Sequence, residues 1–116
     1  MALIHGTVAL VGAGEYLPTM VDVDKALLDR VEGAAHVVVL PTAAVPDGPE
    51  VVDRWTTMGV EHFSQLGANV EAVMLRTRAD ANDDTIVAQL ARANFIYLSG
   101  GKRRYLLETL RGTAAW

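Results

Sequence analysis

The stretch Phe95-Ile96-Tyr97-Leu98-Ser99-Gly100-Gly101-Lys102-Arg103-Arg104-Tyr105-Leu106-Leu107 decides the fold. Its apolar start is too short to form a helix of its own, and it breaks at two glycines before an amphipathic segment begins. This pattern predicts a strand, a tight loop and a helix. In a parallel sheet the loop of residues 99–103 lies at the carboxyl end of a strand, where open α/β sheets bind their ligands. We therefore expect any functional site to include Gly100 and Gly101.

Composition limits the class of protein and its partners. The chain has 116 residues, of which 51% are hydrophobic and 21% charged, so we expect residues 1–116 to form a single packed domain. The net charge of −4 argues against nucleic-acid and anionic-membrane partners. The absence of cysteine excludes disulfides, a thiolate nucleophile and cysteine-ligated metals. Because neither a membrane-spanning run nor a signal-peptide pattern is visible, we expect a cytoplasmic protein.

Four short segments have the apolar or alternating pattern of buried strands, at residues 6–12, 36–40, 70–75 and 95–99. Between and after them, helical periodicity predicts helices at about 20–32 and 51–66, one starting after residue 82 or 83, and one that includes residues 106–110. Three prolines predict that residues 41–49 are not helical.

The spacing of the strand centres is that of a repeated βαβ unit, which predicts a parallel sheet with right-handed crossovers. We expect an α/β fold of three layers, a doubly wound sheet of the flavodoxin or Rossmann type, with four strands in the order 3-2-1-4. This order places the first and fourth strands side by side. The loops of residues 12–15 and 99–102 would then face each other.

Four segments together resemble a known family in their order and spacing. They are residues 6–15, the strand end at 40–44, the loop at 78–82 and residues 96–101, and they are similar to the cyanophycinase and α-aspartyl dipeptidase family of serine peptidases. The resemblance implies a class I glutamine amidotransferase-like fold, of which residues 1–116 form the amino-terminal portion. It also implies a nucleophilic serine in a G-x-S-A-G turn on the next strand, activated by a histidine with an acidic partner. This sequence contains no such turn.

The resemblance assigns roles to residues at the predicted crevice. Gly100 and Gly101 match the glycine pair whose backbone N–H groups stabilise the oxyanion. They are followed by Lys102 and Arg103, where the family often has Asn or Asp followed by Gln or Thr. The ligand implied is a peptide or a small carboxylate, bound without a metal or another cofactor. The substrate-binding residues that we expect are Gly14, Glu15, Thr42, Ala43, Lys102 and Arg103.

Simpler interpretations remain open for several of these residues. Gly14 permits a tight turn in any loop, and Glu15 and the cations at 102–104 are equally compatible with a solvated surface. Cations in the first helical turn oppose the helix dipole by roughly 0.3–1 kcal/mol each, which favours an anion there. The three histidines show no ligand spacing, and Ser99 lies outside any G-x-S-x-G motif. A non-catalytic domain that binds an anionic small molecule and a structural module completed by a partner are the alternative functions.

The predicted strand at residues 95–99 lies at an edge of the sheet in the order 3-2-1-4. Its side chains are apolar, and neither a proline nor an inward charge protects it from pairing with another chain. We therefore expect a partner to cover this strand, either a complementary carboxyl-terminal fragment or a second copy of the chain.

Overall fold

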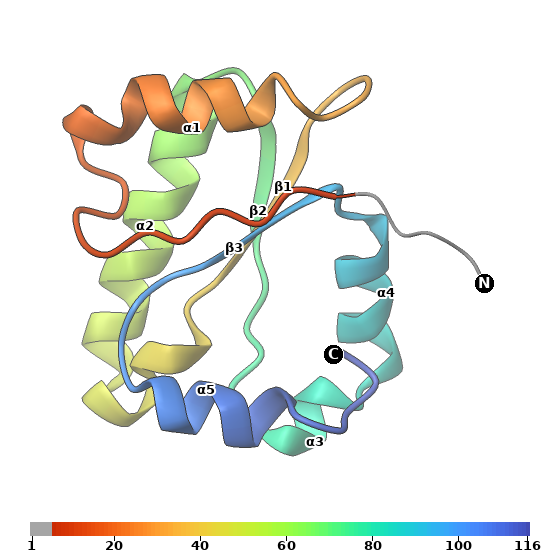
Figure 1. The fold of residues 1–116 in the computed structure, drawn as a ribbon. Helices are drawn as coiled ribbons and strands as arrows, with labels where there is room; N and C mark the ends of the chain where they lie inside the picture. The colour runs from red at the N-terminus through yellow and green to blue at the C-terminus, as the bar shows by residue number, and fades with distance from the viewer. Residues whose placement is uncertain (1–5) are drawn as a thin grey trace.

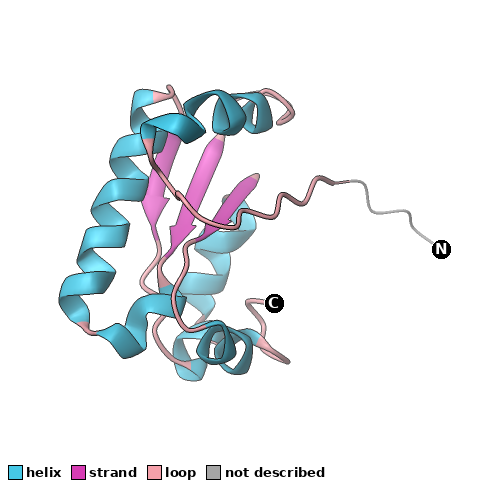
Figure 2. Ribbon diagram, turned by 60° about the vertical axis from the view of Figure 1, so that its left-hand side comes forward, coloured by secondary structure: helices cyan, strands magenta, loops and turns pink. Residues whose placement is uncertain are grey.

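The computed structural model describes residues 6–116, and it consists of a parallel sheet with helices on both faces (Figures 1 and 2). The strands are β1 (His36–Leu40), β2 (Asn69–Ala72) and β3 (Phe95–Leu98). The helices are α1 (Val21–Leu28), α2 (Pro49–Gln65), α3 (Arg78–Ala81), α4 (Asp84–Arg92) and α5 (Arg103–Leu110). Two 3₁₀ helices, η1 (Pro18–Met20) and η2 (Thr42–Asp47), precede α1 and α2.

The sheet is parallel, as expected, but its strand order differs from the prediction. Within residues 6–116 it has three strands in the order β2-β1-β3, with Val37 opposite both Val70 and Phe95. The predicted four-strand order 3-2-1-4 is therefore not found. Residues 6–12 are extended but pair with no strand, and β1 contacts β3 directly in the place where we expected this segment. The segment lies outside the sheet with its apolar side chains in solvent: Val8 is 87% exposed and Leu10 94%.

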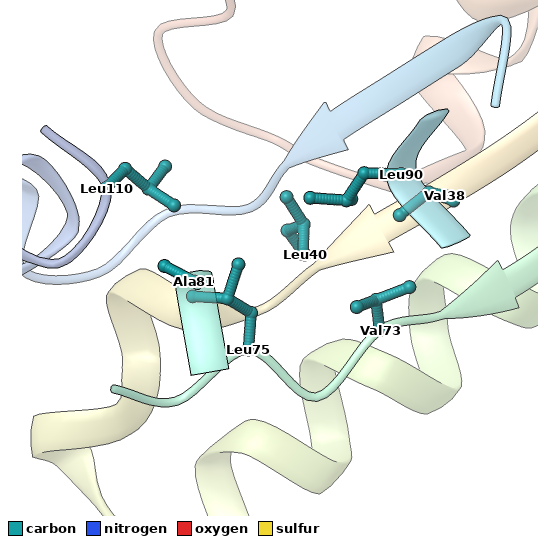
Figure 3. Packing of buried hydrophobic residues seen from close by; sticks show 7 residues of the cluster. All are labelled: Val38, Leu40, Val73, Leu75, Ala81, Leu90 and Leu110. Carbon is teal, nitrogen blue, oxygen red and sulfur yellow. The ribbon is translucent and has the colours of Figure 1, made fainter. Parts of the chain in front are cut away.

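Each face of the sheet carries its own apolar core because successive strand residues point to opposite sides. Val38 and Leu40 of β1 pack with Leu90 of α4 and Leu110 of α5 on one face, as Figure 3 shows. Val37 and Val39 pack on the other face with residues of α1 and α2, among them Phe63, which is fully buried. The continuous apolar pattern of β1 thus reflects burial on both sides.

Three helical segments differ from the sequence-based expectation. Helix α1 ends at Leu28 rather than near residue 32, and its N-cap Met20 provides no side-chain cap. The segment expected to be non-helical contains η2. Its 3₁₀ turns are closed by the N–H groups of Ala44 and Gly48, so Pro46, which has no N–H, does not interrupt them. The polar loop after β2 contains α3, which begins with a reciprocal capping box between Thr77 and Asp80.

Candidate functional site

The turn that follows β3 is locked against the start of η2. Gly101 has a φ of +151°, and a Cβ at this position would overlap the Ala43 carbonyl and lie 2.8 Å from the Ala44 nitrogen. The Lys102 amide donates a hydrogen bond of 2.7 Å to the Ala43 carbonyl. Only glycine allows so close an approach of two backbone segments in this conformation. The sequence pair Gly100-Gly101 therefore fixes where the turn lies on the sheet.

The two glycine amides of this turn have no hydrogen-bond partner among residues 6–116. Neither the Gly100 nor the Gly101 N–H donates a hydrogen bond to another residue among 6–116, whereas the amides of Ser99 and Lys102 on either side do. Gly100 is half-buried and Gly101 exposed, so both residues lie at the surface. Two adjacent free amides of this kind can stabilise an oxyanion when the reacting carbonyl lies within about 3 Å.

The structure brings the loop of residues 12–15 to the turn, although residues 6–12 do not form a strand. The Glu15 carboxylate lies over Gly100, because its Oε1 would be 2.8 Å from a Cβ added there. Gly14 has a φ of +86°, and its carbonyl accepts a hydrogen bond from the Leu17 amide, so this loop is a tight turn. Glu15 is half-buried beside Gly100 rather than fully solvated.

Thr42 and Ala43 lie below the turn and are buried, with exposures of 0% and 2%. The Thr42 hydroxyl donates a hydrogen bond of 2.7 Å to the Leu75 carbonyl. Thr42 thereby holds η2 on the segment after β2 and offers its donor to that segment rather than to a ligand. Ala43 contributes its carbonyl, which accepts from Lys102 and positions the turn.

Two cations lie at the start of α5. The Lys102 side chain is 64% exposed, and its Nζ lies 3.8 Å from Asp47 Oδ1, an ion pair too solvated to hold either side chain firmly. Arg103 is exposed and begins the helix, whose first turn contains no acidic residue. The glycine turn thus has the Glu15 carboxylate over Gly100, and it is followed by two cations, of which Lys102 pairs with Asp47.

Neither serine of the chain has the surroundings of a nucleophile. Ser99 is 2% exposed, and its Oγ donates to the Leu40 carbonyl at 3.4 Å. Ser64 is exposed on α2, and no hydrogen bond joins a serine to a histidine within residues 6–116. In the same part of the chain no group of three or more potential ligands could hold a metal ion, and no helix is long and apolar enough to cross a membrane.

A buried polar cluster beneath the Glu15 loop was missed by the sequence analysis. His62 Nε2 and Asp24 Oδ2 are 2.7 Å apart and both residues are buried. The rings of Tyr16 and Tyr97 lie 4.7 Å apart next to this pair. Burial raises the pKa of both tyrosines well above the usual range, and nearby charges such as that of Asp24 add to the effect. The sequence does contain a signal for the burial of Asp24. Asp24 lies one helical turn before Leu28 and therefore on the same face of α1 as this buried residue.

Comparison with known proteins identifies the family of this chain. The sequence model of peptidase family S51 matches residues 8–116. The chain belongs to peptidase family S51. Among solved structures, a peptidase from an acI-B1 Actinobacterium is similar with a TM-score of 0.85 and 31% sequence identity. The match covers 91% of this chain and 45% of that peptidase, so this S51 chain spans less than half the length of its structural relative. No curated protein matches it.

Membership of family S51 confirms the resemblance that the four sequence segments indicated. It identifies the chain as related to hydrolases, and the α/β architecture with a parallel sheet agrees with this relationship. The glycine turn and the Glu15 loop both lie within the matched residues.

Proposed function

We propose that this chain is the amino-terminal part of an S51 serine peptidase or amidase. In this proposal Gly100 and Gly101 supply the oxyanion N–H groups, and the nucleophile, its base and the acidic partner come from the part of the peptidase that this chain does not cover. The observation that carries the proposal is the glycine turn, in which Gly101 lies against the backbone of Ala43 and Ala44 and neither glycine N–H has a partner among residues 6–116. Preorganised donors of this kind stabilise the tetrahedral intermediate of acyl transfer.

The substrate pocket that we propose surrounds this turn. Glu15 and Gly14 form one wall, and Lys102 and Arg103 form the opposite wall. Ala43 lies in the floor, and Thr42 holds that floor in position through its hydrogen bond to the Leu75 carbonyl. Opposite charges on the two walls suit a substrate that carries both signs, such as a peptide with a carboxylate group.

Complementation tests this function. The probe is the carboxyl-terminal part of the acI-B1 peptidase, namely the segment that the present chain does not cover, expressed as a separate polypeptide. The 116-residue chain alone should not hydrolyse a panel of dipeptides, whereas the mixture should. The Gly100→Pro variant, which removes one proposed donor, should lose at least about 100-fold in kcat, as removal of a single oxyanion donor does elsewhere. Hydrolysis by the chain alone, or full activity of the variant mixture, would contradict the proposal.

A second function, binding of an anionic small molecule without turnover, is favoured by the cations at the start of α5. These cations oppose the helix dipole, and no acidic residue in the first turn offsets them. Isothermal titration with citrate measures this function. If charge-assisted hydrogen bonds form, replacing both Lys102 and Arg103 by Ala should weaken binding by roughly 1–3 kcal/mol in total. Absence of citrate binding by the parent chain would leave the two cations as a solvated surface.

A further inference from the structure

Glu15 and Tyr16 are the two central residues of one tight turn. The Leu17 amide donates a hydrogen bond of 3.1 Å to the Gly14 carbonyl, which closes the turn around them. Tyr16 has a φ of +64°, and among residues 6–116 it is the only residue other than glycine with a positive φ. A positive φ at the third residue is typical of a type II turn, where glycine is preferred because a side chain strains this conformation. A tyrosine at this position therefore needs a compensating contact.

The compensating contact is the burial of the Tyr16 ring. Tyr16 is 6% exposed and packs among aromatic rings of α2 and β3. Its ring centroid lies 4.7 Å from that of Tyr97, 6.0 Å from that of Trp55 and 6.2 Å from that of Phe63. Aromatic pairs at these separations attract each other. The Tyr16 hydroxyl makes no hydrogen bond within residues 6–116, so the packing of the ring holds this residue.

Helix α2 leaves space for this ring at Gly59. Gly59 lies in the interior of the helix, where glycine is unfavourable. A Cβ added to Gly59 would lie 2.9 Å from Tyr16 Cζ and 2.9 Å from Val39 Cγ1. Because position 59 has no side chain, the ring fits between α2 and the sheet. The backbone of α2 and the Tyr97 ring together define where Tyr16 lies.

Two contacts join the turn of residues 14–17 to β3 and to the glycine turn after it. The Tyr16 ring meets Tyr97 in the core, and the Glu15 carboxylate meets Gly100 three residues further along the chain. Burial raises the pKa of both tyrosines, and nearby charges, among them that of Glu15, raise it further, which agrees with a carboxylate close to the two rings. Since Glu15 directly precedes Tyr16, a fixed ring limits where the Glu15 carboxylate can lie.

We propose that Tyr16 is a positioning residue of the candidate site, whose buried ring holds the Glu15 carboxylate beside Gly100. As a statement about the substrate pocket, this inference rests on the proposed function, in which Glu15 forms one wall. The interaction between two charges weakens with distance, so the position of Glu15 sets how strongly it acts on a charged ligand at the glycine turn. Tyr16 exerts this control from the core, without contact with the ligand.

Nuclear magnetic resonance of the ¹⁵N-labelled chain tests this placement. The Gly100 amide is followed while the pH is lowered from about 7 to about 3, the range in which carboxylates become protonated. With the Glu15 carboxylate beside it, this amide should shift on protonation, and Glu15→Gln should abolish that part of the shift. The shift that remains in Glu15→Gln, for example from Asp47 paired with Lys102, is subtracted. Equal Gly100 shifts in the parent chain and in Glu15→Gln would overturn the inference.

Substitutions of Tyr16 separate the effect of the ring from that of the turn. Tyr16→Gly removes the ring but suits the positive φ, so the turn itself can persist. The Glu15-dependent shift of Gly100 should fall about threefold or more, as it does when a charge moves to about three times its distance. Tyr16→Phe keeps the ring and should keep the shift. Leu17→Ala is the matched control, because it lies in the same turn, is 45% exposed and should also keep the shift. An undiminished shift in Tyr16→Gly would show that the turn alone positions Glu15 and would contradict the inference.

Two further measurements decide the question if Tyr16→Gly does not fold. Gly59→Ala leaves Tyr16 intact but places a Cβ 2.9 Å from its ring, so displacement of the ring should reduce the Glu15-dependent shift. In the parent chain, ¹⁵N relaxation of the Glu15 amide should give an order parameter of about 0.85, the value of rigid backbone. A value below about 0.6 would mean that this backbone is flexible and would overturn the inference.

These outcomes are independent of hydrolysis and distinguish the inference from the proposed function. A Glu15-dependent shift that is lost in Tyr16→Gly, combined with a complemented mixture that hydrolyses no dipeptide, supports the positioning role and contradicts the peptidase function. Hydrolysis by the mixture, combined with a parent chain that shows no Glu15-dependent shift, supports the function and overturns the positioning role.

Discussion

Replacing Gly101 by Ala tests whether the glycine turn is fixed by backbone contact. At this position the new Cβ would overlap the Ala43 carbonyl and lie 2.8 Å from the Ala44 nitrogen. Neither atom can move easily, because Ala43 and Ala44 are buried at 2% and 0% exposure. The φ of +151° adds backbone strain, since L-residues rarely adopt it.

The expected loss of stability follows from these two effects. Backbone strain costs about 1–3 kcal/mol, and forcing extra volume into a packed site costs a similar amount. We therefore expect Gly101→Ala to lower the free energy of unfolding by about 3 kcal/mol. Gly100→Ala is the matched control: its Cβ would meet only the Glu15 carboxylate, the movable end of a side chain, so its cost should stay below about 1 kcal/mol.

Urea denaturation followed by fluorescence of Trp55, which packs against the core, measures both variants. With a slope of about 1.5 kcal/mol per M of urea, a loss of 3 kcal/mol lowers the midpoint by about 2 M. The control should shift it by less than about 0.7 M. Equal shifts for the two variants would refute the view that Gly101 is held against Ala43 and Ala44.

Three other predictions concern the neighbouring charges and the buried cluster. Asp24→Ala leaves its buried partner His62 unpaired and should lower the free energy of unfolding by about 3–5 kcal/mol. Asp22→Ala on the same helix is the control and should lower it by less than about 1 kcal/mol. Urea titration measures both variants. Because burial raises the pKa of Tyr16 and Tyr97 in the folded state, the unfolded chain loses protons first, and stability should fall as pH rises above about 10. Tyr97→Phe should make that decline shallower in thermal melts between pH 9 and 11. Lys102→Ala alone should change the unfolding free energy by less than about 1 kcal/mol, because its ion pair is solvated, and a larger change would show that the pair is structural.

Periodicity predicted the elements that are buried by contacts within the chain. β1 was expected because its apolar run is covered on both faces, and α4 because Asp83 caps it and its apolar stripe meets the core. The end of α2 followed from Gly67, which has a φ of +87°. In each case the local pattern and the tertiary contacts agree.

The errors arose where a local pattern does not reveal the tertiary contacts that decide the structure. Residues 6–12 have the composition of a buried strand, but a strand needs a neighbour, and within the described residues neither β1 nor β3 pairs with them. The predicted order followed from assuming that every strand-like segment enters the sheet. Asp24 was missed because a carboxylate on a helix normally indicates its solvated face, whereas here it pairs with His62 in the core.

The arrangement of the candidate site could be predicted in part for a physical reason. Adjacent glycines after an apolar strand indicate a turn at the ligand-binding edge, and the structure places Gly100 beside Glu15 at that edge. The hydrogen bond that occupies the Thr42 hydroxyl comes from a segment distant in sequence, so no local pattern could show that this side chain holds the floor.

The measurement that tests the central claim most directly is labelling with a fluorophosphonate, which reacts with activated serines. The chain alone should remain unlabelled, because Ser99 is buried and no serine in residues 6–116 is hydrogen-bonded to a histidine. With the carboxyl-terminal part of the acI-B1 peptidase added, mass spectrometry should place the label on that polypeptide, and Gly100→Pro should slow its appearance by at least about 100-fold. Labelling of Ser64 or Ser99 in the chain alone would contradict the claim that its nucleophile is supplied by another segment.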